Sequence, residues 1–476
     1  MKPIIRMALA AATLSFAVSA TAQNSNSSYF MEGAVNRHMV NPAFAPRQGY
    51  VAMPALGNFN IDLSTNFNIG DMLFQRNGKT VTFLHPDVTK AEALGGLEDV
   101  NKFRTDINLQ ILGVGFRAFG GYNTITVSSR TFAGFKLPYD LFSIAKDLEN
   151  RSYHVSDASV FGQSFAEVAL GHSRQITEDL RLGAKLKVLV GIARVKAELS
   201  DLDLNLTADQ EWTATAHATV EANMKGLKIT EKSKDYKQTD TNGNTRTYTT
   251  IDDFKTDDFK PIGGMGFAVD LGGEYDFKEL VPGLKASLAI LDLGFINWAE
   301  SHTVANHGDP FTFNGFSNIQ VKDGSGEKFS DQTDRLVDDI TDLYRLENKG
   351  DQGSNSYGIG TTLNVGVEYA LPWYDKVRVG LLSSSRFQEN YGWNEERLSA
   401  NYAPCHWFDM NVNGAIGTFG PSFGWMLNLH PVGFNLYLAM DRTLGKVSKQ
   451  FAPMNKGTQF SMGINFPLQS ARKKIW

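Results

Sequence analysis

Residues that could perform chemistry are few and scattered in this sequence. Neither of the spacings H-E-x-x-H and the phosphate-binding G-x-x-x-x-G-K-[ST] occurs. His302, His307 and Asp309 lie near one another in a Gly- and Asn-rich stretch, without the further positioned ligands of a metal site. His172 and Ser173 are adjacent, and on a strand their side chains would face opposite ways. We predict no enzyme, no metal and no cofactor; a hydrolase with a triad drawn from distant residues stays an alternative.

One stretch has part of the spacing of a calcium loop. Asp240, Asn242 and Asn244 follow the pattern D-x-N-x-N, but the distal glutamate of such a loop is missing. Asp, Asn and Gly are also the residues that most often form turns. We interpret this stretch as a turn within a long charged loop, residues 231–260, that is exposed to solvent.

Charge and cysteine content exclude several classes of protein. The chain has 46 basic and 51 acidic residues and no long block of one sign, so we predict no nucleic-acid partner. Cys405 is the only cysteine, which excludes an intramolecular disulfide and a cysteine-rich metal site. The 44 glycines and 32 phenylalanines, against 15 prolines, favour strands joined by tight turns.

The first 22 residues have the organisation of a secretory signal peptide. Lys2 and Arg6 accompany an apolar run, Met7–Val18, and Ala20–Ala22 has the small residues of a cleavage site. We therefore predict a signal peptide over residues 1–22 and an exported protein. Beyond it, no run of about 18 apolar residues follows, so we expect no transmembrane helix.

Apolar and polar residues alternate with a period of two in several later segments. In 180–190, for example, Leu182 and Leu186 would share one face while charged residues occupy the other. An apolar face toward lipid and a charged face toward a wet lumen is typical of a membrane β-barrel, whose strands need about 9–11 residues to cross. The charged positions predict these lumen-facing side chains: Arg181, Lys185, Lys187, Asp270, Glu274, Glu368, Lys376 and Arg378.

Turn-forming stretches divide the chain into fourteen predicted strands. These are Tyr50–Leu63, Asp106–Ala118, Tyr122–Arg130, Gln163–His172, Leu180–Val195, Gly263–Tyr275, Leu284–Trp298, Tyr357–Ala370, Lys376–Phe387, Glu396–Tyr402, Trp407–Gly417, Ser422–Leu429, Val432–Asp441 and Thr458–Leu468. Short turns alternate with longer connections, with one exception at Thr418–Pro421. An outer-membrane barrel is expected to have short turns at one end and long loops at the other. The alternative, a soluble β-sandwich, does not require this alternation of connection lengths.

The predicted fold class is therefore all-β: a transmembrane antiparallel outer-membrane β-barrel of about 14 strands. The barrel would occupy residues 50–468, between an N-terminal plug segment at 23–49 and a tail at 469–476, with both termini on the short-turn side. We also expect short helices in loops, at 330–349 and 137–148, and a hairpin over 201–220. Trp373 and Trp407 would lie in one aromatic girdle and Trp298 and Trp393 in the other, unless they are core residues.

The segment Arg37–Pro46, RHMVNPAFAP, does not suit a helix or a strand. Pro42 and Pro46 exclude an ordinary helix or central strand, yet Met39, Val40 and Phe44 are apolar. A proline-stiffened segment loses less entropy when it docks, so these side chains are suited to filling a lumen. The alternative is that the segment only leads the chain into its first strand.

Four stretches of this sequence resemble a known family. They are NPAF at Asn41–Phe44, ALGHSRQITEDLRLGAKLKVLVGIA at Ala169–Ala193, the stretch from Gly266 to Trp298 that ends in ILDLGFINW, and LSANYAPCHWFDMNVNGAIG at Leu398–Gly417. They resemble the FadL-like fatty-acid channels and, more closely, an uncharacterised family of Gram-negative outer-membrane proteins related to them and to PorV-type secretion barrels. The resemblance implies a fourteen-stranded barrel plugged by Asn41, Pro42 and Ala43, with Phe44 beside them. Long charged loops and an inward face with both charge signs depart from a fatty-acid channel.

Two functions remain open on this sequence. One is a passive, plug-gated transporter of a hydrophobic or small amphipathic molecule in the outer membrane of a Gram-negative bacterium. The other is a non-transporting interaction or scaffold barrel for protein secretion or surface display. Expected partners are outer-membrane lipid and the barrel-assembly machinery, together with a hydrophobic ligand in the first case and surface or secretion proteins in the second.

Overall fold

The computed structural model describes residues 25–76, 79–146, 151–205, 212–239, 245–256, 258–306, 311–313, 346–443 and 456–468. The predicted signal peptide, the tail at 469–476 and most of the predicted loop helix at 330–349 lie outside the described residues. So do Asp240, Asn242, Asn244, His307 and Asp309, and their predicted roles stay predictions.

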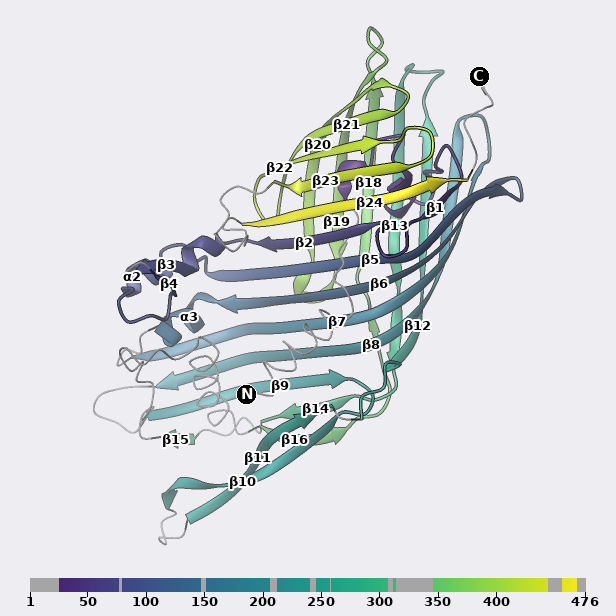
Figure 1. Cartoon of the computed structure of the whole chain (residues 1–476). Helices are drawn as coiled ribbons and strands as arrows, with labels where there is room; N and C mark the ends of the chain where they lie inside the picture. Colours follow the sequence, from purple (N-terminus) through teal and green to yellow (C-terminus); the bar gives the residue numbers. More distant parts are fainter. Residues whose placement is uncertain are drawn as a thin grey trace.

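The wall of the molecule is one antiparallel barrel of fourteen strands, two of which are interrupted. The wall strands are β1 (Tyr50–Ala52) with β2 (Phe59–Thr65), β5 (Val100–Ala118), β6 (Gly121–Pro138), β7 (Ser152–Gln175), β8 (Leu180–Asn205), β12 (Gly264–Asp276), β13 (Leu284–Trp298), β17 (Asn355–Gly358) with β18 (Thr361–Ala370), β19 (Val377–Phe387), β20 (Trp393–Cys405), β21 (Phe408–Gly417), β22 (Ser422–Leu429), β23 (Asn435–Arg442) and β24 (Gly457–Pro467). The barrel closes where Tyr50 pairs with Pro467. The predicted fold class and strand number are confirmed (Figure 1).

Connections alternate in length around the wall, as predicted. At one end, β5 turns into β6 through Phe119 and Gly120, both with positive φ. Residues 176–179, 277–283, 371–376, 406–407 and 430–434 make the other connections at that end. The opposite end carries the longer connections, together with two short ones at 388–392 and 418–421. Tyr50 and Pro467 are paired at the short-turn end, so the described chain enters and leaves the barrel on that side.

Several strands are longer than predicted and leave the barrel as a projecting sheet. β7 has 24 residues and β8 has 26, more than twice the number that a membrane crossing needs. Beyond the barrel, β8 pairs with β9 (Trp212–Asn223), which in turn pairs with β14 (His302–Ala305) and β15 (Phe311–Phe313), and β14 pairs with β16 (Glu347–Asp351). The sequence underestimated these strands because Ser152–Ser159 contains few apolar residues, and its pairing with β8 determines its conformation.

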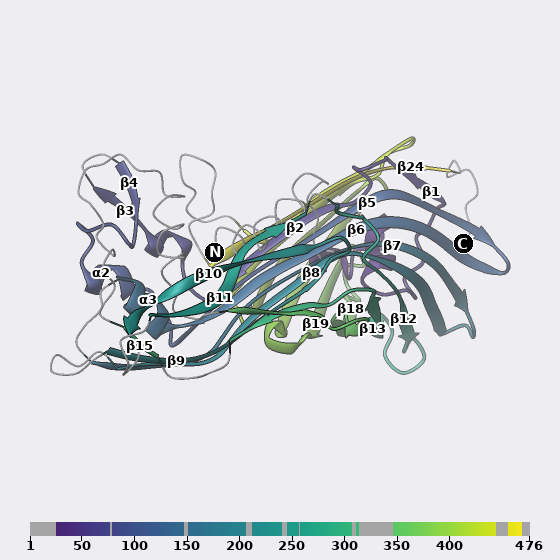
Figure 2. The same cartoon turned by 90° about the horizontal axis from the view of Figure 1, so that it is seen from below.

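The stretch 231–260, which we predicted to be a charged loop exposed to solvent, contains strands in its described part. β10 (Lys228–Thr239) and β11 (Thr245–Lys255) pair as a hairpin that lies against β16. The predicted hairpin over 201–220 is confirmed by the pairing of β8 with β9. Figures 1 and 2 show this sheet and hairpin beyond the long-loop end of the barrel.

Short helices and a small hairpin cover part of the long-loop end. They are η3 (Ile69–Met72), β3 (Leu73–Arg76), β4 (Lys79–Thr82), α2 (Lys90–Leu94), α3 (Tyr139–Lys146) and η4 (Glu389–Tyr391). α3 confirms the helix predicted within 137–148, and Phe142 packs there against Val88, Ala93 and Leu94. Among the described residues, we find no helix with the length and hydropathy to cross a membrane.

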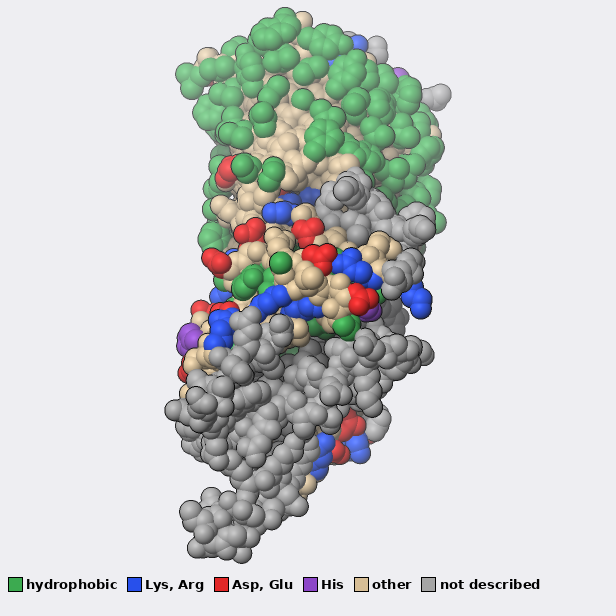
Figure 3. Space-filling view, turned by 90° about the vertical axis from the view of Figure 1, so that its left-hand side faces the viewer, with side chains coloured by type: hydrophobic (Ala, Val, Ile, Leu, Met, Phe, Trp, Pro, Cys, Tyr) green, Lys and Arg blue, Asp and Glu red, His purple; other side chains and the backbone are tan. Residues whose placement is uncertain are grey.

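The two faces of the barrel wall differ as the alternation predicted. Leu182 and Leu186 are exposed on the outside, whereas Lys185 and Lys187 are buried on the inside. Figure 3 shows hydrophobic side chains over the upper part of one face and charged side chains gathered below them. Trp298 and Trp393 are buried, so their predicted place in an outer girdle is wrong. They fall on inward positions of β13 and β20, while Trp373 and Trp407 are exposed near the short turns.

Candidate functional site

Residues 25–49 lie inside the barrel and form the plug, the name we use for them below. The plug has two short 3-10 turns, η1 (Asn26–Ser28) and η2 (Val35–Met39), and no longer element. Pro42 and Pro46 follow η2 and prevent a continuing helix. Asn41 and Ala43 are completely buried, and Phe44 is nearly so. Figure 1 shows the plug in purple between the near and far walls of the barrel.

The side chain of Asn41 joins the plug to the wall. Its Oδ1 accepts a hydrogen bond of 2.9 Å from the backbone N–H of Ala43, which closes a turn around Pro42. Its Nδ2 donates to the carbonyl oxygens of Gly273 in β12 and Leu288 in β13, at 3.4 and 3.3 Å. One side chain therefore shapes the plug turn and attaches it to two strands.

Inward-facing glycines let the plug approach the wall backbone. A Cβ at Gly272 in β12 would lie 2.1 Å from Asn41 Oδ1, and a Cβ at Gly183 in β8 would lie 2.3 Å from the carbonyl carbon of Pro42. Gly366 in β18 and Gly380 in β19 give the same clearance to Tyr29 and Phe30 of the plug. These four glycines form the glycine seat, which accommodates the plug only because it has no side chains.

Two carboxylates hold the N-terminal half of the plug. Glu32 forms ion pairs with Lys285 in β13 at 3.0 Å, with Arg47 at 2.8 Å, and with Arg378 in β19. Burial disfavours its charge, but Lys285 and Arg378 outweigh burial and hold the pKa of Glu32 well below its usual range. Asp441 in β23 accepts hydrogen bonds from the backbone N–H groups of Asn26 and Ser27, at 2.6 and 3.0 Å.

Apolar contacts complete the seating of the plug. Tyr29, Phe30, Val40 and Phe44 pack as one cluster with Leu382 of β19. The Tyr29 ring lies edge-on to both phenylalanine rings, with centroids 4.9 and 5.0 Å apart. These side chains lie in the lumen, where the sequence placed Val40 and Phe44.

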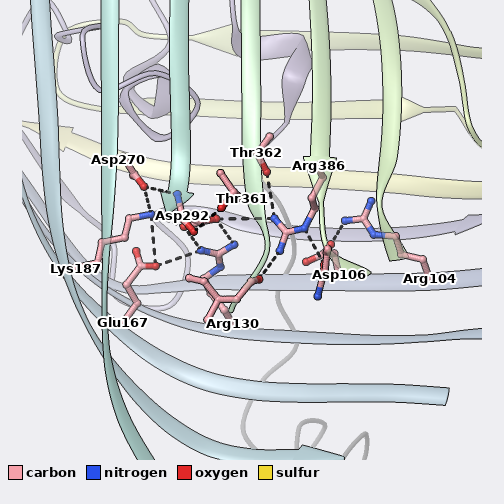
Figure 4. A network of polar contacts seen from close by, with 12 residues as sticks. Arg104, Asp106, Arg130, Glu167, Lys187, Asp270, Asp292, Thr361, Thr362 and Arg386 are labelled. Atoms are coloured by element: carbon pink, nitrogen blue, oxygen red, sulfur yellow. Dashed lines mark hydrogen bonds and ion pairs between the residues drawn. The ribbon is translucent and has the colours of Figure 1, made fainter. Parts of the chain in front are cut away.

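A network of charged side chains fills the lumen next to the plug (Figure 4). Its centre is Asp292 in β13, which has a φ of 60° and is buried. Arg130 in β6 binds Asp292 with two parallel hydrogen bonds of 2.7 and 2.8 Å, and Lys187 Nζ lies 2.6 Å from Asp292 Oδ1. Lys187 also pairs with Asp270 at 2.8 Å, and Arg130 with Glu167 at 3.3 Å. Such multiply paired charges make this part of the lumen a polar, filled layer.

The charged layer extends to the interruption between β17 and β18. Arg386 in β19 lies 3.9 Å from Asp292 and donates to the carbonyl oxygen of Ile359 at 3.1 Å and to the Thr362 hydroxyl at 3.3 Å. Arg386 therefore satisfies a backbone carbonyl in the gap that separates the two strand segments.

Arginine and aromatic side chains line the lumen on the long-loop side of the charged layer. Phe132, Phe161 and Tyr391 pack together with ring centroids 5.5 Å apart in each pair. Arg194 in β8 lies 3.6 Å from the centre of the Tyr357 ring, a cation–π contact. The lumen is thus occupied on both sides of the charged layer, by aromatic residues on one and by the plug on the other.

Cavities within the described part of the chain are small in the lumen and larger at the short-turn end. A cavity of about 50 Å³ separates the plug from the charged layer. Two cavities of about 280 Å³ flank the plug near the short turns. One of them has an apolar side that includes Val35, Tyr50, Phe434 and Pro467.

The structure distributes the predicted lumen residues over several groups. Lys187 and Asp270 belong to the charged layer, and Lys185 lines the 50 Å³ cavity. Arg181 and Glu274 form a half-exposed pair at 3.7 Å, and Glu368 lies 3.7 Å from Arg378 beside the plug anchor Glu32.

Lys376 differs from the other candidates. It is exposed in the turn before β19, because that strand begins one residue later than predicted. Of the other chemical candidates, His172 is exposed, whereas Ser173 is buried and donates to the Ala43 carbonyl oxygen. They point to opposite faces of β7, as expected for neighbours on a strand.

Sequence reasoning missed the centre of the charged layer. The sequence assigns no role to Asp292 within ILDLGFINW, and no motif marks Glu167, Arg130 or Arg386. A signal was present, since Arg130 and Glu167 occupy polar positions within otherwise alternating strands. Their convergence depends on pairing between β6, β7, β8 and β13, which the sequence alone does not show.

Comparisons with known proteins place the chain in a family of unknown function. Residues 42–441 match a family described as "Family of unknown function (DUF5723)". A comparison with curated proteins found no match. The predicted kinship with an uncharacterised family is confirmed in this form, while the kinship with PorV-type barrels stays a prediction.

Solved structures match the chain over most of its length, at low sequence identity and low TM-score. The chain is similar to a Pseudomonas aeruginosa FadL homologue, with 9% identity, a TM-score of 0.42 and coverage of 95% of this chain and 100% of that chain. It is also similar to the Pseudomonas putida toluene transporter TodX, with 8% identity, a TM-score of 0.36 and coverage of 94% and 93%. The CymD monoaromatic hydrocarbon channel gives 10% identity, a TM-score of 0.37 and coverage of 94% and 95%.

Proposed function

We propose that this chain, which belongs to the DUF5723 family of unknown function, is a plug-gated passive transporter of a small hydrophobic or amphipathic molecule. We place it in the outer membrane of a Gram-negative bacterium and assign it no enzymatic activity. The observation that carries the proposal is the seating of residues 25–49 inside a membrane-type barrel. The contacts that hold this plug are non-covalent, so it can leave its seat without breaking the wall.

The contacts of the plug support a gate. Glu32 and Asp441 attach the first half by ion pairs and hydrogen bonds. Hydrogen bonds from Asn41, Ser173 and Asn364 attach the second half. Hydrogen bonds of this kind contribute only about 0.5–1.5 kcal/mol each in net terms. Release of a few contacts at a time therefore provides a stepwise route from the closed to an open lumen.

The character of the lumen supports a small amphipathic solute over a long-chain lipid. The charged layer around Asp292 presents ionic groups of both signs, and burial of a long alkyl chain against them would be unfavourable. The cavity beside Tyr50 and Phe434 combines apolar side chains with Arg47 and His430. A solute with one apolar and one polar end matches both surroundings.

The proposal is tested by removing the plug. We expect that deletion of residues 25–48 increases the uptake of small aromatic and amphipathic solutes into proteoliposomes. A matched control deletes residues 228–255 and should leave uptake unchanged, because the described strands of this stretch, β10 and β11, pair with each other and not with the barrel wall. Equal uptake by the intact and plug-deleted barrels, with both shown to be folded by heat-modifiable gel mobility, would contradict the proposal.

A scaffold role is the second candidate, and the projecting sheet favours it. β9, β14 and β16 extend the wall beyond the barrel, and the charged β10–β11 hairpin lies against them. A transporter does not require this surface. In cells of the native host, cross-linking from an engineered cysteine at exposed Asp252 should capture secreted or surface proteins if the scaffold role is correct; capture of lipid alone would exclude it.

A further inference from the structure

The small cavity between the plug and the charged layer has the character of a binding site. Met39 and Val40 of the plug form one side of it, and Thr126, Ser128 and Lys185 of the wall form another. Its volume is about 50 Å³. A single water molecule requires about 10–15 Å³ on this measure, so the cavity has room for a small ion and accompanying water.

Lys185 is a buried cation that forms no ion pair or hydrogen bond in the described part of the chain. Its side chain lines the cavity, and the residue is 6% exposed. Asp270 is its register partner on β12, but the Asp270 carboxylate pairs with Lys187 and accepts the backbone N–H of Asp292. An ammonium group that is buried without a directly bonded counter-charge is unfavourable, and the carboxylates near Lys185 are paired with other cations.

The charges that line the cavity do not balance. The cations are Arg130, Lys185, Lys187 and Arg386, and the anions are Glu167, Asp270 and Asp292. Four positive and three negative groups leave one positive charge in excess. The hydroxyl groups of Thr126 and Ser128 also line the cavity, and neither has a side-chain partner among the described residues. Hydroxyls can donate hydrogen bonds to an anion.

We infer that this cavity binds one small monovalent anion, such as chloride, with Lys185 as the principal partner. The Thr126 and Ser128 hydroxyls donate to the same ion. The site goes beyond the proposed transport function, because it is an internal site for an inorganic ion. Since the plug forms one side of the cavity, the anion stabilises the seated plug, and the seated plug raises the affinity for the anion by the same factor.

The first test compares thermal unfolding of the full-length barrel in detergent with sodium chloride and with sodium gluconate at equal ionic strength. Gluconate is too large for the cavity, so we expect a higher Tm in chloride that rises with the logarithm of its concentration. Lys185→Met should abolish the difference between the two salts. Lys376→Met, which removes an exposed lysine from a turn, should retain it.

A second measurement keeps the inference testable if Lys185→Met does not fold. The double variant Thr126→Val, Ser128→Ala should reduce the chloride-dependent rise in Tm. Crystals soaked in bromide should show anomalous density beside Lys185. Equal Tm in the two salts, an unchanged effect in Lys185→Met, or bromide found at the surface only would each overturn the inference.

Discussion

Asp292 is the residue of the charged layer around which three cationic side chains meet. It is bound by Arg130 and Lys187 and approached by Arg386, and its left-handed backbone lies where the pairing of β13 passes from β18 to β17. A non-Gly residue with positive φ is uncommon, although Asp tolerates it better than most residues. A buried ion pair adds little net stability over an apolar replacement, but removal of one partner leaves an uncompensated charge.

We therefore predict that Asp292→Asn strongly destabilises the barrel. Loss of one member of a buried ionic group typically costs about 3–5 kcal/mol, because the remaining charges stay desolvated. The measurement is the thermal unfolding midpoint in detergent. Glu396→Gln is the control, since Glu396 is exposed and accepts one hydrogen bond of 2.6 Å from Ser383. Equal midpoints for Asp292→Asn and Glu396→Gln would show that the charged layer is not required for stability.

His38 gives the plug a pH-sensitive residue. It is completely shielded in η2, its Nε2 lies 2.7 Å from the Tyr50 hydroxyl, and Lys185 lies near it. Burial and the Lys185 charge both hold the pKa of His38 well below its usual value of 6.5. The seated plug therefore contains neutral His38, whereas a released plug binds a proton near pH 6.5.

The sign of the pH effect follows from this difference. The released state binds more protons below about pH 6.5, so plug seating is fully favoured above that pH and weakens as the pH falls. Glu32 does not contribute in this window, because its stabilising effect is lost only below its usual pKa of 4.5. We expect greater solute uptake into proteoliposomes at pH 5.5 than at pH 8. His38→Gln should flatten this profile, and a profile that persists in His38→Gln would assign the effect to another group.

At the scale of single elements, the strands β8, β12, β18 and β19 make room for the plug because they have glycines, without side chains, at inward positions. Gly183, Gly272, Gly366 and Gly380 face inward at the places where the plug backbone or rings approach. In a strand interior, glycine weakens pairing and often marks a close approach of another backbone. In this protein the approaching segment is the plug. The four glycines weaken the pairing of their own strands, but they leave the space that the plug occupies.

We predict that Gly272→Val displaces the plug without unfolding the barrel. The new Cβ would lie 2.1 Å from Asn41 Oδ1, and overpacking of this kind costs about 1–3 kcal/mol. Trypsin should then cleave after Arg37, which is buried when the plug is seated. Gly273→Val is the matched control on the same strand, because its Cβ would have no atom nearer than 3.5 Å. If Gly272→Val resists cleavage, the wall strand and not the plug has moved to accommodate the valine side chain.

At the scale of the whole molecule, the barrel was predictable because lipid imposes a strict alternation on every crossing strand. Leu182, Leu186, Phe267 and Leu381 are exposed outside, where period two placed them. The projecting parts were not predictable in this way. Ser152–Ser159 and the hairpin β10–β11 project beyond the barrel, where lipid imposes no such pattern, and their strands follow from pairing with neighbours.

The site was predictable only where a local sequence carried the signal. The prolines and apolar residues of Arg37–Pro46 indicated a compact segment before the first strand, and it lies in the lumen. Glu32 and Asp441 are single carboxylates without a surrounding motif, and their partners are far away in the sequence. No spacing rule connects residues that meet only after fourteen strands have closed.

The pairing of Tyr50 with Pro467 has a consequence for the order of folding. This contact joins the first wall strand to the last, so it cannot form until the whole barrel sequence has been made. Contacts between residues so far apart in sequence form slowly, because ordering the intervening chain costs entropy before the contact can form. Residues 25–49 precede the first wall strand, but their seat is formed by β8, β12, β13, β18 and β19. The plug therefore reaches its final contacts only after most of the wall has formed.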